Sequence, residues 1–125
     1  MASSGTCTIT EETVGSMKKV KWVWTTSSGQ AAAASRVTSN TYNGAVQRLV
    51  TIPDASSAPS ASYSVTVLDQ DSTDILMGAG GSRAAAATEQ KLAASLGVIA
   101  NDTMTLNVTS MGSSSTAGTV IVYIR

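Results

Sequence analysis

The sequence predicts an all-β protein: an antiparallel β-sandwich or small barrel of seven to eight short strands, with one short helix. Apolar and polar residues alternate with a period of two in most of the regular segments, which is the pattern of half-buried strands. Turn-forming residues interrupt these segments about every eight to twelve residues. A chain of 125 residues is long enough to bury a core, so we expect one β domain over residues 1–125.

The clearest strand is predicted over residues 19–25. Val20, Trp22 and Trp24 share one face of this segment, and lysines and threonine share the other. Both tryptophans therefore point the same way, and we expect at least one of them in the core. A first strand is expected over residues 7–10, where apolar residues alternate with threonines.

A hairpin is predicted in the middle of the chain. Residues 33–42 favour a weak strand. Asn43-Gly44 favours a type I′ turn, because both central residues of that turn need a positive φ. Residues 45–52 would run back as the second strand, and Pro53 would end it, since proline cannot donate to a ladder.

The second half of the chain alternates again, with turn residues at 69–73 and a flexible glycine-rich loop at 78–82. The strands expected here cover residues 63–68, 74–77, 103–109 and 119–124. The last of them is apolar on both faces, which is typical of a central strand. A hairpin loop over residues 112–118 would join it to the strand before it.

One short helix is predicted near residues 88–96. Thr88 would cap it, Leu92 and Leu96 would share one face, and Gly97 suits the position after its end. A helix of about nine residues is shorter than those that are stable alone, so it would form only by packing.

Composition argues against several classes of function. Eight basic and eight acidic residues cancel, whereas nucleic-acid binding needs clustered Lys and Arg. Histidine, the commonest general base, is absent from the sequence. Cys7 is the single cysteine, so it can form neither an intrachain disulfide nor a zinc site, and it is expected to be buried. Glu11 and Glu12 would face opposite sides of a strand as solvated charges. We expect no catalytic residues, no cofactor and no enzymatic activity.

The beginning of the chain indicates neither export nor membrane insertion. Residues 1–6 have no positively charged or apolar region of a signal peptide, and we expect them to form a flexible N-terminal arm. No apolar stretch approaches the ~18 residues of a membrane helix, so no membrane partner is expected.

Two motifs suggest ligand chemistry. Asp69, Asp71 and Asp74 bring three carboxylates into one short turn, and Ca²⁺ prefers oxygen ligands. The Gly and Glu of an EF-hand loop are missing, and aspartate is common in turns, so a plain turn without metal is the favoured interpretation. The segment Gly78 to Arg83 lacks the third glycine of a dinucleotide fingerprint and the Gly-Lys of a P-loop, which favours a simple loop.

The segments from residue 42 onward follow a particular order of turns and strands. They are Tyr42-Asn43-Gly44, the run from Arg48 to Asp54, the run from Tyr63 to Asp69 with Asp71 and Asp74, the run from Thr105 to Val108, and the ending from Gly118 to Arg125. In this order they resemble small tailed-phage virion proteins encoded among head genes, some of which are capsid decoration (cement) proteins. The resemblance covers roughly two thirds of the chain and implies a non-enzymatic structural protein of the virion, made in the host cytoplasm.

The resemblance also implies partners. A decoration protein would bind the major capsid protein and stabilise the head shell. It would associate with itself, as a trimer first and a dimer second, because shell decoration proteins often lie on local threefold axes. Two alternatives remain open: a tail, adaptor or fibre component of the same particle, and a small ligand-binding or carbohydrate-binding β module.

Overall fold

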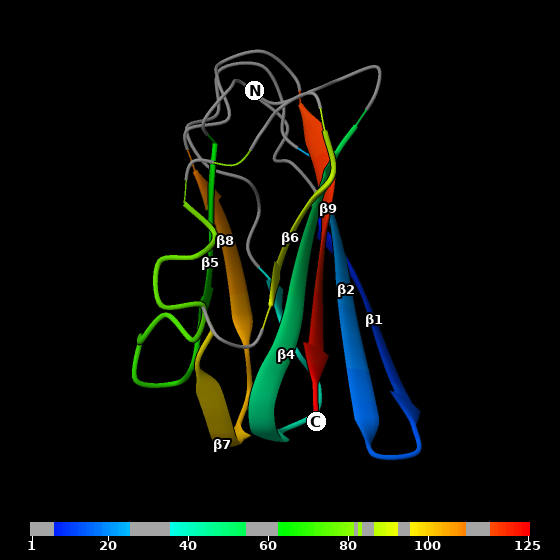
Figure 1. Cartoon of the computed structure of the whole chain (residues 1–125), viewed down its shortest axis with the longest axis vertical. Helices are drawn as coiled ribbons and strands as arrows, with labels where there is room; N and C mark the ends of the chain where they lie inside the picture. Colours follow the sequence, from blue (N-terminus) through cyan, green and yellow to red (C-terminus); the bar gives the residue numbers. More distant parts are fainter. Residues whose placement is uncertain are drawn as a thin grey trace, which may run out of the picture.

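The chain forms two antiparallel β-sheets that pack face to face, as a computed structural model shows (Figure 1). The structure describes residues 7–25, 36–54, 63–81, 83, 87–92, 96–109 and 116–125. Within these residues the strands are β1 (Cys7–Val14), β2 (Met17–Thr25), β3 (Arg36–Val37), β4 (Tyr42–Pro53), β5 (Ser64–Leu68), β6 (Glu89–Leu92), β7 (Val98–Asp102), β8 (Thr105–Thr109) and β9 (Ala117–Ile124).

The larger sheet is built around the two long strands β4 and β9. Its strands are ordered β1-β2-β9-β4-β6, and β7 also pairs with β4. β9 lies between β2 and β4, which confirms that the apolar segment at residues 119–124 is a central strand. A register shift between Val46 and Arg48 accommodates one extra residue, Gln47, so that both Val46 and Leu49 point into the core.

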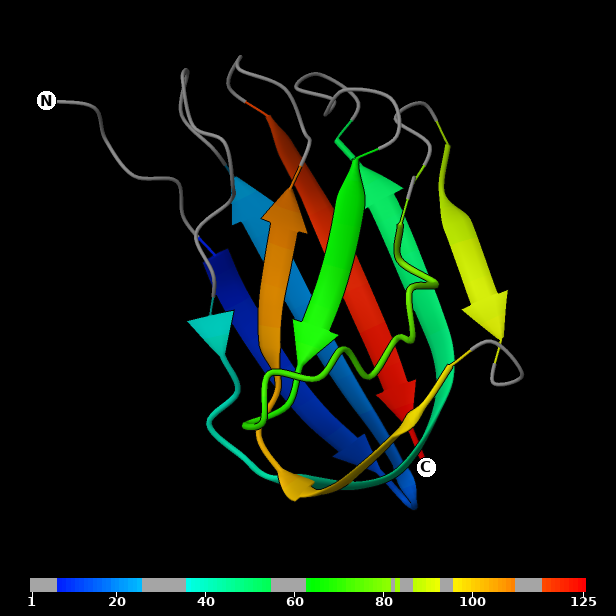
Figure 2. The same ribbon diagram turned by 90° about the vertical axis from the view of Figure 1, so that its left-hand side faces the viewer.

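The smaller sheet is ordered β3-β8-β5 and covers one face of the larger sheet (Figure 2). Among the described residues no ladder closes the two sheets into a barrel, so of the two predicted architectures the sandwich is the one observed. Each sheet buries one face against the other, as in other sandwiches.

The core lies between the two sheets. Val20, Trp22 and Trp24 of β2 are fully buried, which confirms the predicted face and places both tryptophans in the core. Cys7 is buried as well, as expected. A buried tryptophan removes about 150–250 Å² from water, which corresponds to ~4–6 kcal/mol of transfer free energy at ~25 cal/mol per Å². The facing layer contributes Val65, Val67, Met104, Leu106 and Val108.

Several predicted strands are confirmed. Residues 7–10 lie in β1, 19–25 in β2 and 45–52 in β4, which ends at Pro53 as expected. Segments 63–68 and 103–109 contain β5 and β8. In β2, β5 and β8 the cause is an alternation that puts every second side chain into the core.

The predicted helix over residues 88–96 is wrong in its described part. Residues 89–92 form β6, which pairs with Arg48–Thr51 on the side of β4 that β9 leaves open. Pairing with an existing strand satisfies backbone groups and covers a sheet edge, whereas a helix of about nine residues is marginal alone. Residues 93–95 lie outside the described part of the chain.

The predicted hairpin around Asn43-Gly44 is also wrong. The strand expected over 33–42 is reduced to β3 in the described residues, and β3 belongs to the smaller sheet while β4 belongs to the larger. Gly44 does have a positive φ of 131°, but it lies within β4, where the register with β7 shifts. A Cβ at Gly44 would collide with the carbonyl oxygen of Arg125, so the glycine permits a close backbone approach there.

Two further expectations fail for topological reasons. β8 and β9 belong to different sheets, so they do not pair as the hairpin expected around residues 112–118, and residues 117–118 of that range already lie in β9. The returning strand expected over residues 74–77 is a series of turns with one isolated bridge, Leu68 to Asp74. The expected N-terminal arm, residues 1–6, lies outside the described residues.

The turns after β5 protect the open edge of the smaller sheet. The amide of Val65 donates a hydrogen bond to the carbonyl of Gly80 (2.8 Å), and the amide of Ile75 donates one to the carbonyl of Val67 (2.8 Å). The amide of Arg83 donates to the carbonyl of Tyr63 over 2.6 Å. The segment from Asp69 to Arg83 therefore satisfies backbone groups of β5 without forming a strand of its own.

Candidate functional site

The predicted aspartate turn brings together a different set of carboxylates from the one expected. Oxygens of Asp69, Asp71 and Asp102 lie within 4.8 Å of one another. Asp102 comes from the end of β7, which packs beside this turn. Oxygens this close could surround one Ca²⁺ ion, whose ligands lie at about 2.3–2.6 Å. The expectation of a turn without bound metal stays a prediction.

Asp74 serves the backbone of the turn. Its Oδ1 accepts hydrogen bonds from the amides of Val67 (3.2 Å) and Leu76 (3.0 Å), and its Oδ2 accepts one from Gly78 (2.9 Å). Asp69 acts in the same way, because its Oδ1 accepts from the amides of Asp71 and Thr73. These contacts are the usual reason for aspartate in turns.

Asp102 was missed by sequence reasoning. Its Oδ2 accepts a hydrogen bond from the amide of Gln70 and its Oδ1 accepts one from Thr103. Nothing in the local pattern around residue 102 indicates that β7 will lie beside the turn after β5. The contact between Asp102 and this turn joins residues 32 positions apart, and no local signal encodes it.

Glu11 is the most heavily used carboxylate on the β1 side of the molecule. It accepts hydrogen bonds from the Tyr42 hydroxyl (2.7 Å) and from the amides of Ser39 (3.0 Å) and Asn40 (3.1 Å). Burial raises the pKa of Glu11, but these hydrogen bonds outweigh it and bring the pKa below its ordinary value of 4.5. Burial, followed by the Glu11 carboxylate, raises the pKa of Tyr42.

This arrangement corrects the expectation that both neighbouring glutamates are solvated. Glu11 ties the segment before β4 to β1, whereas Glu12 is exposed on the other side of the strand. A hollow of about 310 Å³ opens beside Glu11, lined also by Lys18 and Tyr42. The carboxylate oxygens of Glu11 beside this hollow already accept hydrogen bonds from the protein. This favours a structural role for Glu11 over a role in ligand binding.

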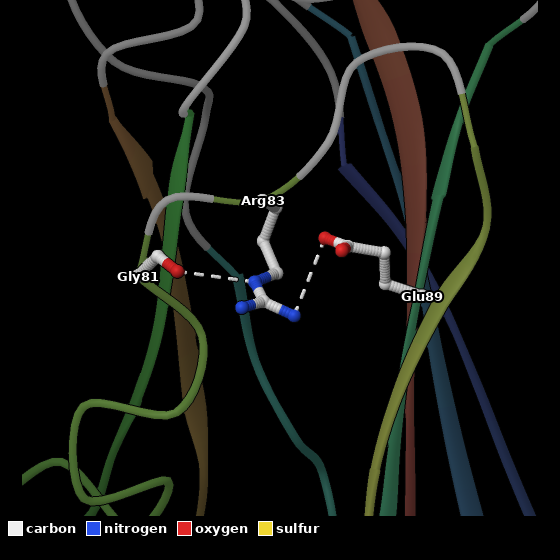
Figure 3. A network of polar contacts seen from close by, with 3 residues as sticks. All are labelled: Gly81, Arg83 and Glu89. Carbon is white, nitrogen blue, oxygen red and sulfur yellow. Dashed lines mark hydrogen bonds and ion pairs between the residues drawn. The ribbon is translucent and has the colours of Figure 1, made fainter.

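A second polar contact crosses the interior of the sandwich. Arg83 reaches from the segment beside β5 toward Glu89 on β6, with Nη1 and Oε1 3.4 Å apart, and its Nε donates to the carbonyl of Gly81 (Figure 3). The Arg83 side chain is 9% exposed and the Glu89 side chain 35%, so the pair links the segment beside β5 to β6 with only the arginine buried. Arg83, at the end of the predicted glycine-rich loop, is therefore held by a hydrogen bond and an ion pair. That this segment does not bind phosphate stays a prediction.

Polar groups that lie in the core near this pair are only partly satisfied. Trp24 and Tyr63 have ring centroids 6.0 Å apart. The Tyr63 hydroxyl lies near Thr51, but no hydrogen bond of regular geometry joins them, and Trp24 Nε1 is also unpaired. Burial raises the pKa of Tyr63.

The aromatic residues do not form a surface platform. The chain has two tryptophans, three tyrosines and no phenylalanine, and all five aromatic residues are described. Four are buried, and Tyr123 is half-buried with the guanidinium of Arg48 5.3 Å from its ring centroid. An exposed flat ring, which could stack on a flat apolar ligand, is therefore absent from the described surface.

Comparisons with known proteins give distant likenesses only. No family model matches the sequence, and no curated protein sequence matches it either. Among solved structures the chain is similar to FlhE, at 12% identity and a TM-score of 0.44, over 86% of this chain and 97% of that one. It is also similar to a carbohydrate-binding module of the β-sandwich superfamily, at 12% identity and a TM-score of 0.41, over all of this chain and 56% of that one.

A phage protein is among the similar structures too. The enzymatically active domain of tailspike protein 4 from bacteriophage CBA120 is 16% identical with a TM-score of 0.38, over 97% of this chain and 19% of that one. At this distance the similarities have no bearing on what the present chain binds or does. The described residues also contain no helix with the length and apolar character needed to cross a membrane.

Proposed function

We propose that this protein is a non-enzymatic structural component of a tailed-phage particle, and specifically a decoration protein that binds and stabilises the head shell. One structural observation supports the proposal most. In the described part of the chain, the carboxylates of Glu11, Asp69, Asp74 and Asp102 and the buried Arg83 are engaged in holding turns and sheets together. Where they line a hollow, as Glu11 does beside β1 and Asp69 and Asp74 do beside the turn after β5, their oxygens already accept hydrogen bonds from the protein. This use differs from the convergent acid and base groups of an active site.

The order of segments from residue 42 onward gives the proposal its particular context, since it resembles small head-gene proteins of tailed phages. The structure adds a compact module with two sheets and a net charge of zero. Such a module can pack in many copies without strong mutual repulsion. We expect the protein to associate with itself as a trimer first and a dimer second, and to contact the major capsid protein.

A carbohydrate-binding module is less well supported. Its usual means of holding a sugar would be an exposed aromatic face, and the five aromatic side chains here are buried or half-buried. A tail, adaptor or fibre component remains the nearer alternative, because it has the same structural requirements as a head protein.

Mass spectrometry of purified particles tests the proposal. Heads and tails are separated, and the amount of this protein is measured relative to the major capsid protein. A decoration protein should be found in the head fraction, at a copy number comparable with that of the capsid protein. A copy number that fits a single ring would identify a tail or adaptor component, and absence from both fractions would overturn the virion assignment.

A further inference from the structure

The larger sheet has one face that the smaller sheet does not cover, here called the outer face. Val20, Trp22 and Trp24 point into the core, so the alternate residues of β2 point outward. Residues directly opposite each other on antiparallel strands share a face. The outer face therefore consists of three rows across β1, β2, β9 and β4: Glu12, Lys19, Tyr123 and Arg48; Thr10, Lys21, Ile121 and Val50; and Thr8, Val23, Thr119 and Ile52.

The middle of the outer face is apolar. Ile121 and Val50 are only 8% and 5% exposed although they point away from the core, and they are not part of the core cluster. Val23 is 39% exposed in the neighbouring row. Long side chains such as Lys21 can lie over such residues with their stems and keep their charge in water.

The charge on the outer face is mainly positive. Its rows contain Lys19, Lys21 and Arg48 but only one carboxylate, that of Glu12. Among the described residues none of these three cations takes part in an ion pair. Arg48 lies over the ring of Tyr123, which holds its guanidinium in place at the surface. The face thus combines an apolar centre with three cations that form no ion pair among the described residues.

The complementary charge lies on the other side of the same molecule. Asp69, Asp71 and Asp102 form what is here called the acidic corner, at the turn after β5 and the end of β7. This turn is on the opposite side of the sandwich from β1 and β2 (Figure 1). No Lys or Arg occurs between residues 69 and 81. Although the net charge of the chain is zero, positive charge is concentrated on the outer face and negative charge at the acidic corner.

We propose that the outer face of one copy of this chain binds the acidic corner of a second copy. The charge complementarity between the two surfaces carries this inference, and the partly exposed Val23 and Ile52 of the outer face supply apolar area that association can bury. A pair related by a twofold axis through the outer face would bring cations against cations. A head-to-tail contact avoids this, and it closes into a ring if its rotation allows, or otherwise continues as an open array.

The inference rests on the self-association that belongs to the proposed function, and two variants test it separately. In the face variant, Lys19→Glu and Lys21→Glu reverse the charge of the outer face. In the corner variant, Asp71→Lys reverses an exposed charge that accepts no described hydrogen bond. Light scattering over a range of concentrations should show that each variant associates at least about tenfold more weakly than the wild type.

Mixing the two variants provides the decisive result. The corner variant keeps an intact outer face and the face variant keeps an intact acidic corner, so a head-to-tail contact predicts a complex of one copy of each. Lys91→Glu is the control, because it reverses one lysine charge on β6, on the side opposite to the outer face, and should assemble like the wild type. Circular dichroism establishes that each variant is folded.

The remaining outcomes distinguish failure of the head-to-tail interface from failure of the self-association on which it rests. A wild type that stays monomeric at every concentration would contradict both. A wild type that assembles, with variants that assemble equally well, would overturn only the interface. Variants that remain monomeric when mixed would show that the contact is not head-to-tail.

Discussion

The central strands of the larger sheet and the segment from Asp69 to Arg83 are ordered by different interactions. In β2, β4 and β9, apolar side chains are buried, and backbone groups pair in a ladder that is regular except for the shift between Val46 and Arg48. In the segment beside β5, carboxylates accept backbone hydrogen bonds, and single amides pair with the strand at intervals. One region is therefore stabilised mainly by burial of apolar area, and the other by local acceptors for its backbone.

The largest expected effect comes from removing apolar volume at the centre. Trp22→Ala should lower the free energy of unfolding by about 3–5 kcal/mol, because the fully buried ring leaves a cavity. Val23→Ala, at the next residue but on the outer face, should cost less than about 1 kcal/mol. Urea denaturation measures both changes, and similar losses for the two variants would contradict the assignment of faces.

The second effect tests the turn segment. Asp74→Ala should cost about 1–3 kcal/mol, since three backbone amides lose their acceptor. Asp71→Ala, which removes a neighbouring carboxylate that accepts no described hydrogen bond, should cost less than about 0.5 kcal/mol. Hydrogen exchange at Leu76 and Gly78 should become faster in the first variant only. If exchange there is unchanged, the aspartate does not order the turn.

The difference between the two regions also explains how much was predictable. The alternation around Trp22 identifies a strand and its buried face, because a strand with one buried face must repeat every two residues. Pairing partners are not local properties, so the strand at residues 89–92, the placement of β8 and β9 in different sheets, and the meeting of Asp102 with Asp71 could not be predicted. Gly44 shows the limit of prediction from local sequence. The Asn43-Gly44 pair predicts the positive φ of Gly44, but it does not predict that this glycine lies within β4.

A third effect asks whether carboxylate acceptors also order the segment before β4. Because the pKa of Glu11 is lowered in the folded protein, its contribution to stability is present above its ordinary pKa of 4.5 and is lost as pH falls through the folded value. Glu11→Gln should cost about 1 kcal/mol near neutral pH and should reduce the loss of stability on acidification. Glu12→Gln is the control, and equal behaviour of the two variants would refute the role of Glu11.

The smallest effect is expected from removal of metal ions. If amide hydrogen bonds alone order the turn that holds Asp69, Asp71 and Asp102, then EDTA should leave the melting temperature unchanged. A bound calcium ion would stabilise the folded state by linkage. A clear fall in melting temperature on chelation, restored by added calcium, would show that this turn is a metal site.

The most direct test of a shell-binding role uses particles prepared without this protein. Purified protein is added back to them, and the temperature at which the shells release their contents is measured with and without it. A decoration protein should bind in a saturable ratio to the capsid protein and raise that temperature, because a ligand that binds only the intact shell stabilises it. Absence of binding, or binding with no change in shell stability, would contradict the proposed function.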